Sequence, residues 1–556
     1  MDLINSNASI ENSLWPTPEQ IQPEQAPSGF SAGREVTVYE KSQSLFLDLP
    51  ELTQRMIIRY LGFREITRLK KVCKHLRDLV ENDKAQERAW YRQIPSPYPF
   101  QLESILRAKD EQQLRHWLKP FADRGAVESL IEQQKSLYFP AQLLFINSKL
   151  MSQCEKFKLV DKAEIRHVNQ VKTASFSPDG RHLVTASHDD RHLLNGSHKI
   201  YVQKDDGSWE PKVAISHDRS VLFANVSRDG RHLVIGNVDR TARIYGLEDD
   251  GTSKITATIT HTCKINTATF SADGRHLVTA SNDKTAKIYG LEEDGSWEIK
   301  NTITHTIPVL SATFSADSRH AVTTGSDEVK ILSQGDDGSW EVEDTIHQRW
   351  IISAKLSPNG RHLVIIGDDT IQKIYVQGAA GSWVEKNTRV YGTPASAKFS
   401  ADSCHLATVG WDGQVIIFSL QDDGSWQEIA TSEHDLVVVS ATFSADSRHL
   451  VTASYDSTAK IFNLQDDGSW QEIATIVHDD GVRSATFSTD GLHVVTASND
   501  GTAKISGLQA GGSWRVKAII QHNDAVTSAD FSADSRHVVT VDEDYKLRIT
   551  ELWKND

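Results

Sequence analysis

The residues of this chain that could do chemistry together are histidine, threonine and aspartate at fixed spacings. In the clearest case Thr279 follows His261 after 18 residues and Asp283 follows it after 22. A base, a hydroxyl and a carboxylate are the groups of a nucleophilic catalytic triad. The histidine and aspartate recur eight times at this spacing, and seven repeats carry the threonine. One catalytic site needs one set, so we interpret the eight sets as hydrogen-bond networks that brace the fold.

These sets run through most of the chain, from the first repeat to the last. The histidines are His167, His217, His261, His305, His347, His434, His478 and His522. Their aspartates are Asp189, Asp239, Asp283, Asp327, Asp369, Asp456, Asp500 and Asp544. A ninth aspartate, Asp412, is preceded by Tyr391 in place of histidine.

The other candidate ligands give little reason to expect a metal site. His188, His192 and His198 gather in an insertion of the first repeat, which we interpret as a solvated loop. The four cysteines are too scattered to predict disulfides or zinc ligands: Cys73, Cys154, Cys263 and Cys404. We expect no catalytic residue, no metal and no cofactor, and therefore no enzyme.

A block of about 44 residues positions these side chains and recurs nine times after Ser152. In the third copy, strands are predicted over 266–270, 276–281, 285–291 and 297–303. This period, with four strands per unit, predicts a mainly β propeller of about nine four-stranded blades, with eight as the alternative. The last copy lacks its fourth strand, and the strand-like stretch 156–165 is predicted to complete that blade and close the ring.

The composition changes before the repeats begin. Residues 1–42 are polar and rich in proline, which predicts disorder. Helical periodicity predicts a small all-α module over 43–92 and a helical linker over 93–150, followed by the propeller over 151–556.

The repeats resemble the WD-repeat family in the spacing of histidine, threonine and aspartate. The family's tryptophan is replaced here by other aromatic residues: Tyr245, Tyr289, Tyr375, Phe418 and Phe462.

The helical module resembles an F-box, with its Leu-Pro start, its Val-Cys-Lys stretch and a trailing Trp90. The resemblance implies binding to a Skp-family adaptor through ten residues: Leu49, Pro50, Leu52, Ile57, Leu61, Ile66, Leu69, Val72, Cys73 and Leu76. An F-box followed by a WD-repeat propeller resembles the substrate receptors of Skp–cullin–F-box ubiquitin ligases. The partners so implied are the adaptor, the cullin complex and a protein substrate.

Two alternatives stay open. The chain could be a WD-repeat scaffold without a ubiquitin-ligase role. Since the closely similar repeats indicate recent duplication, it could also be a bacterial or viral effector that mimics such a receptor in a host cell.

The positions where repeats disagree predict the substrate site. Each repeat's four predicted strands are called a to d in chain order. In the loops that join strand d to the next strand a, and strand b to strand c, repeats five to seven carry Arg349, Trp350, Trp411 and Tyr455. The equivalent loops of repeats two and three carry Arg219, Arg240, Lys264 and Lys284. Aromatic and arginine anchors favour protein binding, and a basic sector favours an acidic or phosphorylated segment. The alternative is drift between repeats with no ligand.

The overall charge argues against other partner classes. Acidic residues number 75 and basic residues 60, for a net charge of −15, which disfavours general binding of nucleic acid or anionic membranes. The sequence shows no apolar run long enough to span a membrane and no signal peptide at its start. We expect a cytoplasmic location, with the nucleus or a host cytosol as alternatives.

Overall fold

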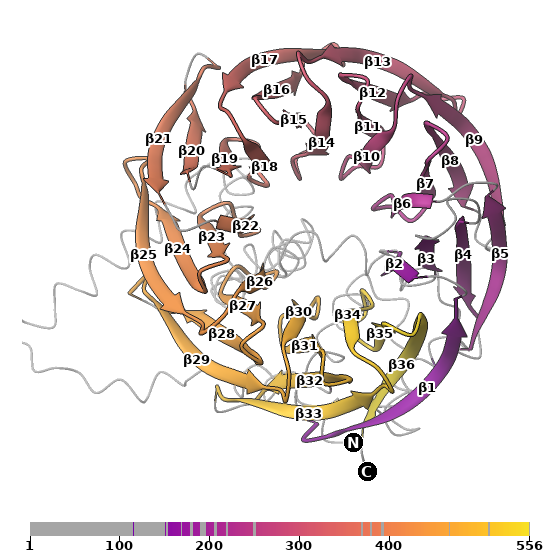
Figure 1. Cartoon of the computed structure of the whole chain (residues 1–556), viewed down its shortest axis with the longest axis vertical. Coiled ribbons are helices and arrows are strands. Elements are labelled where there is room, and N and C mark those ends of the chain that lie inside the picture. The colour runs from indigo at the N-terminus through magenta and orange to yellow at the C-terminus, as the bar shows by residue number, and fades with distance from the viewer. Residues whose placement is uncertain are drawn as a thin grey trace, which may run out of the picture. The chain divides into compact units, whose positions relative to one another are not determined.

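The computed structural model describes residues 115, 151 and 154–554, except for residues 168–169, 178–181, 189–195, 205–207, 218–220, 248–251, 369–370, 379–380, 391–393, 466 and 510–511. The predictions for 1–42, 43–92 and all but residue 115 of 93–150 lie outside the described residues. Within them, 36 strands form nine four-stranded antiparallel sheets, arranged as a ring in Figure 1. The prediction of nine blades is confirmed, and the eight-blade alternative is wrong. No helix in this part of the chain is long and apolar enough to cross a membrane.

Each of the first eight blades consists of four consecutive strands, a to d. Blade 1 has β2 (Gln170–Phe176), β3 (His182–His188), β4 (Gly196–Gln203) and β5 (Trp209–His217); blade 2 has β6 (Val221–Val226), β7 (His232–Asn237), β8 (Thr241–Leu247) and β9 (Ser253–Thr260). Blade 3 has β10 (Ile265–Phe270), β11 (His276–Ser281), β12 (Thr285–Leu291) and β13 (Trp297–Thr304); blade 4 has β14 (Val309–Phe314), β15 (His320–Gly325), β16 (Glu328–Gln334) and β17 (Trp340–His347). Blade 5 has β18 (Ile351–Leu356), β19 (His362–Gly367), β20 (Ile371–Gln377) and β21 (Trp383–Val390); blade 6 has β22 (Pro394–Phe399), β23 (His405–Gly410), β24 (Gln414–Leu420) and β25 (Trp426–Glu433). Blade 7 has β26 (Val438–Phe443), β27 (His449–Ser454), β28 (Thr458–Leu464) and β29 (Trp470–Val477); blade 8 has β30 (Val482–Phe487), β31 (His493–Ser498), β32 (Thr502–Leu508) and β33 (Trp514–Gln521).

Blade 9 is built from both ends of the propeller sequence. It combines β34 (Val526–Phe531), β35 (His537–Asp542) and β36 (Lys546–Lys554) with β1 (Phe157–Arg166), which pairs antiparallel with β36. In Figure 1 the purple β1 lies beside the yellow β36. The predicted closure is confirmed, and it removes the two open edges that a linear array of blades would leave.

The core lies between neighbouring blades because each sheet buries both faces of its inner strands. In blade 3, five of the six residues of β11 are buried, whereas the outer strand β13 is largely exposed. One apolar cluster joins Val234 of blade 2 to Leu277 and Tyr289 of blade 3. A single blade cannot cover these faces, so the blades stabilise one another.

The tryptophan that follows each Gly-Ser turn fills this space between blades. The ring of Trp297, at the start of β13, stands edge-on to His232 of the preceding blade, with 5.5 Å between ring centroids. Trp209 of blade 1 meets His537 of blade 9 in the same way, at 6.1 Å. At the closing seam Phe157 of β1 contacts His493 of blade 8 at 5.4 Å. These tryptophans are therefore packing residues.

Candidate partner-binding face of the propeller

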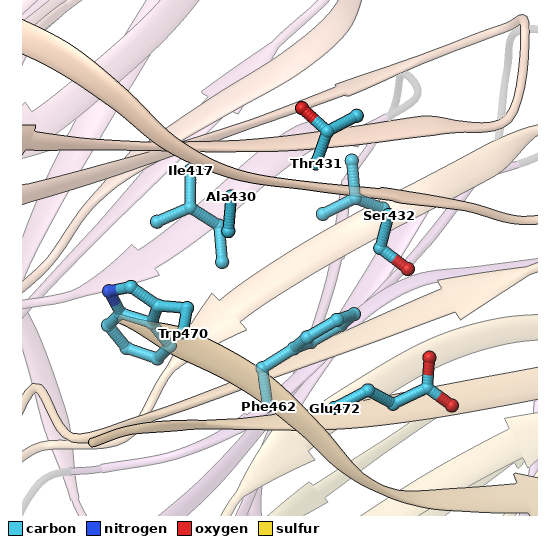
Figure 2. A pocket seen from close by; sticks show the side chains of 8 residues that line it. Ile417, Ala430, Thr431, Ser432, Phe462, Trp470 and Glu472 are labelled. Atoms are coloured by element: carbon cyan, nitrogen blue, oxygen red, sulfur yellow. The ribbon is translucent and has the colours of Figure 1, made fainter. Parts of the chain in front are cut away.

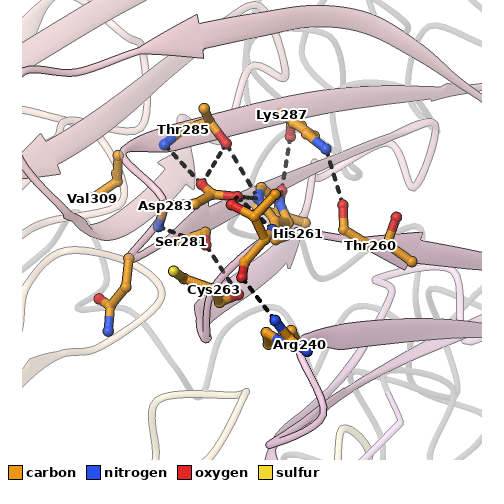
Figure 3. Close-up of polar contacts among 12 residues, drawn as sticks. Arg240, Thr260, His261, Cys263, Ser281, Asp283, Thr285, Lys287 and Val309 are labelled. Carbon is orange, nitrogen blue, oxygen red and sulfur yellow. Dashed lines mark hydrogen bonds and ion pairs between the residues drawn. The ribbon is translucent and has the colours of Figure 1, made fainter.

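The histidine, threonine and aspartate of blade 3 are joined by hydrogen bonds, and Figure 3 shows His261 next to Asp283. Nδ1 of His261 lies 2.9 Å from a carboxylate oxygen of Asp283, and its Nε2 lies 2.9 Å from the hydroxyl of Thr279. The same arrangement recurs in blades 7 and 8, at His434 and His478. The hydroxyl, the imidazole and the carboxylate are hydrogen-bonded in the same succession as in a catalytic triad. Whether the hydroxyl could react therefore depends on its accessibility to a substrate.

Burial excludes the hydroxyls of these networks as nucleophiles. Thr279 is 0% exposed, and its hydroxyl is also within 3.4 Å of the carbonyl oxygen of Lys287. Burial lowers the pKa of His261 even though Asp283 opposes the shift, so the imidazole is held neutral. Burial would raise the pKa of Asp500, but the hydrogen bonds it accepts, first from Thr502, outweigh this and lower the pKa to about 2. These sets are framework, as the sequence predicts.

Three members of the predicted networks differ from the sequence interpretation. In blade 4 the turn after β15 is one residue shorter than in blade 3, so Glu328, and not Asp327, lies 3.1 Å from Nδ1 of His305. In blade 9, His522 contacts Asp542 at 2.8 Å, and not Asp544. A search for a fixed spacing of 22 residues misses an acidic residue at a nearby position in the turn, even though its carboxylate still reaches the imidazole.

His347 is the third error, because the structure leaves it exposed. It pairs with Glu328 at the end of β17, and the following loop to β18 is one residue shorter than the loop from His305 to Val309. Gln348 therefore takes the histidine position, where its backbone N–H donates to the carbonyl of Asp327 at 3.2 Å. In blade 5 the threonine position holds Ile365, so a histidine in this loop would have had no threonine hydroxyl as a hydrogen-bond partner.

The networks also define one face of the ring. Each bracing histidine lies in the loop from strand d to strand a, and its carboxylate lies at the turn from strand b to strand c, so both connections are at the same end of the strands. We call the side that carries these d–a loops and b–c turns the upper face. The remaining turns, a–b and c–d, lie at the opposite end of the strands.

Seven of the eight predicted substrate-binding residues are described, and all seven are exposed on the upper face: Arg240, Lys264, Lys284, Arg349, Trp350, Trp411 and Tyr455. Trp350 is 66% exposed and Trp411 62%. The eighth, Arg219, lies outside the described residues, as do the ten adaptor-binding residues from Leu49 to Leu76. Whether these side chains bind a partner stays a prediction.

Sequence reasoning missed three further apolar residues of this face. Leu310 and Ile352 are 41% and 46% exposed at the second position of strand a in blades 4 and 5, and Leu436 is 54% exposed in the loop before blade 7. Together with Trp350, Trp411 and Tyr455 they form what we call the apolar arc, which covers blades 4 to 7 only. Alignment of the repeats could have identified them, because the other copies carry mostly smaller or polar residues at these positions.

The backbone at Trp350 is strained. Its φ is 59°, in the left-handed region that bulky residues rarely adopt. The loop is held there because the carbonyl oxygen of Trp350 accepts a hydrogen bond from the backbone N–H of Asp368 at 2.7 Å. A strained, exposed tryptophan contributes nothing to the core, which points to a function for its side chain.

A cavity of about 240 Å³ lies between the outer strands of blades 6 and 7. Figure 2 shows Trp470 and Phe462 beside Thr431, Ser432 and Glu472. The Glu472 carboxylate is already engaged by Lys460 at 3.3 Å and by the Thr475 hydroxyl at 2.8 Å. We therefore interpret the cavity as a gap in packing. Among the described residues, no group of three or more His, Cys, Asp or Glu side chains is placed to hold a metal ion.

Comparisons with known families agree with this architecture. The family model of the F-box domain matches residues 46–85, and the model described as WD domain, G-beta repeat, matches residues 162–193, 253–290, 426–463, 470–505 and 514–550. This chain is an F-box/WD-repeat protein. The matched repeats fall on blades of the ring, and the F-box match covers most of the helical module predicted over 43–92.

Solved structures extend the likeness of this F-box/WD-repeat protein at the level of the fold. Sqt1 from Chaetomium thermophilum is 16% identical with a TM-score of 0.52, and the alignment covers 72% of this chain and 100% of that one. The same Sqt1 bound to the N-terminus of the ribosomal protein L10 aligns with equal identity and coverage and a TM-score of 0.50. At this identity the likeness concerns the fold alone. No curated protein sequence matches the chain.

Proposed function

We propose that this F-box/WD-repeat protein is the substrate-recognition subunit of a Skp–cullin–F-box ubiquitin ligase. The F-box would bind the Skp adaptor, and the upper face of the propeller would bind a protein substrate. The chain would supply no chemistry itself. It would raise the local concentration of substrate lysines near the charged ubiquitin carrier. We place this activity in the cytoplasm, or in a host cytosol if the chain is an effector.

The observation that carries this proposal is the presence of two binding modules in one chain. An F-box match precedes a closed ring whose upper face exposes an apolar arc and whose triad-like sets are buried. A propeller of similar fold, Sqt1, has been solved with the N-terminus of a ribosomal protein bound, which supports the idea that such a ring can hold a peptide. Exposed aromatic residues on a loop-rich face are suited to the same task.

The first test is binding of the full chain to the Skp adaptor. We expect the wild-type chain to retain the adaptor in a pull-down and the Leu49→Ala/Pro50→Ala variant to lose it. Gln54→Ala, a polar substitution in the same segment, serves as the matched control and should behave like the wild type. Absence of adaptor binding by the wild-type chain would overturn the proposal.

The second candidate function is a scaffold that binds partners through the propeller without recruiting a ligase. The confirmed framework role of the repeats suits it equally well. It predicts partner binding without adaptor binding, and no ubiquitin transfer to the partner in a reconstituted reaction. The receptor proposal predicts transfer that depends on both the intact Leu49-Pro50 pair and the upper face.

A further inference from the structure

We propose that the apolar arc binds a segment in which large apolar side chains are flanked by lysine or arginine. This deepens the proposed function, and it rests on that function only in taking the upper face as the substrate-binding face. It differs from the acidic or phosphorylated substrate that the basic loops of repeats two and three predict.

The arc is a specific departure from an otherwise repetitive surface. Blades 7 and 8 share their bracing histidine, their Ser-Ala-Thr-Phe strand and their Gly-Ser-Trp turn. They differ on the upper face, where Leu436 and Tyr455 of blade 7 correspond to Asp480 and Asn499 of blade 8. Because the framework is retained while these positions change, the difference serves the surface and not the fold. Exposed aromatic residues confined to one sector are typical of a binding site.

Backbone contacts join three members of the arc across the seam between blades 6 and 7. A Cβ on Gly413 would overlap the carbonyl oxygen of His434 and lie 3.1 Å from that of Leu436, so the turn that carries Trp411 is packed against the next loop. The backbone N–H of Tyr455 donates to the carbonyl of Val437 at 3.0 Å. Trp411, Leu436 and Tyr455 are therefore presented by a single contiguous stretch of loops.

The same stretch leads directly into exposed carboxylates. A Cβ on Gly481 would lie 2.8 Å from Cδ1 of Tyr455, so this ring rests on the backbone that follows Asp479 and Asp480. Upper-face carboxylates accompany the arc and continue through blades 8 and 9, and all of these are exposed: Asp368, Asp412, Asp435, Asp479, Asp480, Asp524, Glu543 and Asp544. Among the d–a loops and b–c turns of blades 6 to 9 that the structure describes, there is no lysine or arginine. Two arginines lie close by: Arg483, at the second position of strand a of blade 8, pairs with Glu543 at 2.6 Å, and Arg349 is next to Trp350 in the chain.

This combination has a clear chemical preference. Indole and phenol faces attract cationic side chains, and carboxylates at their margins add ion pairs and charge-assisted hydrogen bonds. The same charges repel an acidic or phosphorylated segment that would enter between them. The apolar anchors would supply most of the affinity and the carboxylates the choice of partner.

The test selects 12-residue peptides from a random display library on the immobilised full-length chain and measures binding of the resynthesised peptides by fluorescence anisotropy. We expect the selected peptides to carry an aromatic or large aliphatic residue next to lysine or arginine. The Trp411→Ala/Tyr455→Ala variant should weaken their binding about thirtyfold, as loss of interface anchors does. The Asp435→Lys/Asp479→Lys variant should weaken it about tenfold at low salt, and added salt should reduce that difference.

The matched control is the same charge reversal at the opposite end of the strands. Asp336→Lys/Asp422→Lys, at exposed positions of two c–d turns, should bind the selected peptides like the wild type, and circular dichroism should show that all variants fold. Selection of acidic peptides, no selection at all, or equal loss of binding in the control variant would each overturn the proposal, as would preference for a phosphorylated peptide over its lysine-containing counterpart. None of these results depends on adaptor binding, so this proposal and the ligase proposal can fail separately.

Discussion

Removal of the Asp456 carboxylate should destabilise the ring, whereas the same change at Asp412 should not. The Asp456 carboxylate accepts hydrogen bonds from Nδ1 of His434 at 2.7 Å, from the backbone N–H of Asp435 at 3.1 Å, and from the backbone N–H and hydroxyl of Thr458 at 2.9 and 2.6 Å. Asp412 is exposed and accepts a hydrogen bond from the backbone N–H of Gln414 at 3.1 Å. The two turns are otherwise equivalent, so the pair isolates the network.

The expected magnitude follows from these contacts. Asp456→Ala leaves the buried imidazole of His434 without its acceptor, and the loss of a hydrogen bond to a charged group costs about 1.5–3 kcal/mol. Asp412→Ala should cost less than about 1 kcal/mol, since its groups can bond water instead. Melting temperatures of large domains fall by about 1–2 °C per kcal/mol when the dependence on chain length is extended to this size. Circular dichroism at pH 7 should therefore show a decrease of about 2–6 °C for Asp456→Ala and of about 1–2 °C or less for Asp412→Ala.

Two results would refute the framework interpretation. The first is an equal decrease for the two variants. The second concerns the other copies of the network. Asp283→Ala and Asp500→Ala should destabilise the ring as Asp456→Ala does, because their histidine contacts are alike, and a copy without this effect would contradict the interpretation. If one copy proved dispensable for stability yet essential for function, that set would be a site and not a brace.

Three other predictions test the core, the seam and the strained loop. Burial lowers the pKa of His167 and His305 from 6.5 to about 4, so on acidification the unfolded chain takes up protons before the folded chain does. The free energy of unfolding should therefore fall as the pH drops from about 6.5 toward 4. A melting temperature at pH 5 equal to or above that at pH 7 would contradict this. Phe157→Ala removes the ring contact with His493 and should cost about 3–5 kcal/mol, with faster hydrogen exchange in β1 and β36 than in the blades opposite; uniform exchange would argue against closure by β1. Trp350→Asn should raise the melting temperature, by relief of about 1 kcal/mol of left-handed strain, while it weakens partner binding; a lower melting temperature would show that the indole supports the fold.

The repeat architecture could be predicted from the sequence because it rests on local patterns. Strand alternation, the turns between strands and a fixed period recur in every copy, so errors in one copy are corrected by the others. The missing fourth strand of the last repeat and the spare stretch before the first predicted the closing pair β1–β36 in the same way. The upper-face position of Trp350, Trp411 and Tyr455 followed from the same register.

Two of the three errors arose where one residue of loop length changed a partner. Glu328 replaces Asp327 beside His305 because the turn between β15 and β16 is one residue shorter than in blade 3. Gln348 takes the place predicted for His347 because the loop between β17 and β18 is also one residue shorter. Hydrogen bonding depends on where a side-chain oxygen lies, and a longer side chain one residue away can reach the same point. Spacing alone cannot represent this.

By itself, then, the sequence determined the four-stranded repeat, the means of closure and the framework nature of the histidines, while the choice between nine blades and eight came from the structure. Only the tertiary structure decided which carboxylates each histidine meets and which side chains reach solvent. It also decided that Leu310, Ile352 and Leu436 join the aromatic residues in one arc beside the carboxylates of blades 7 to 9. The reason is physical: exposure and charge at a surface depend on neighbours that are distant in the sequence and that only closure of the ring brings together.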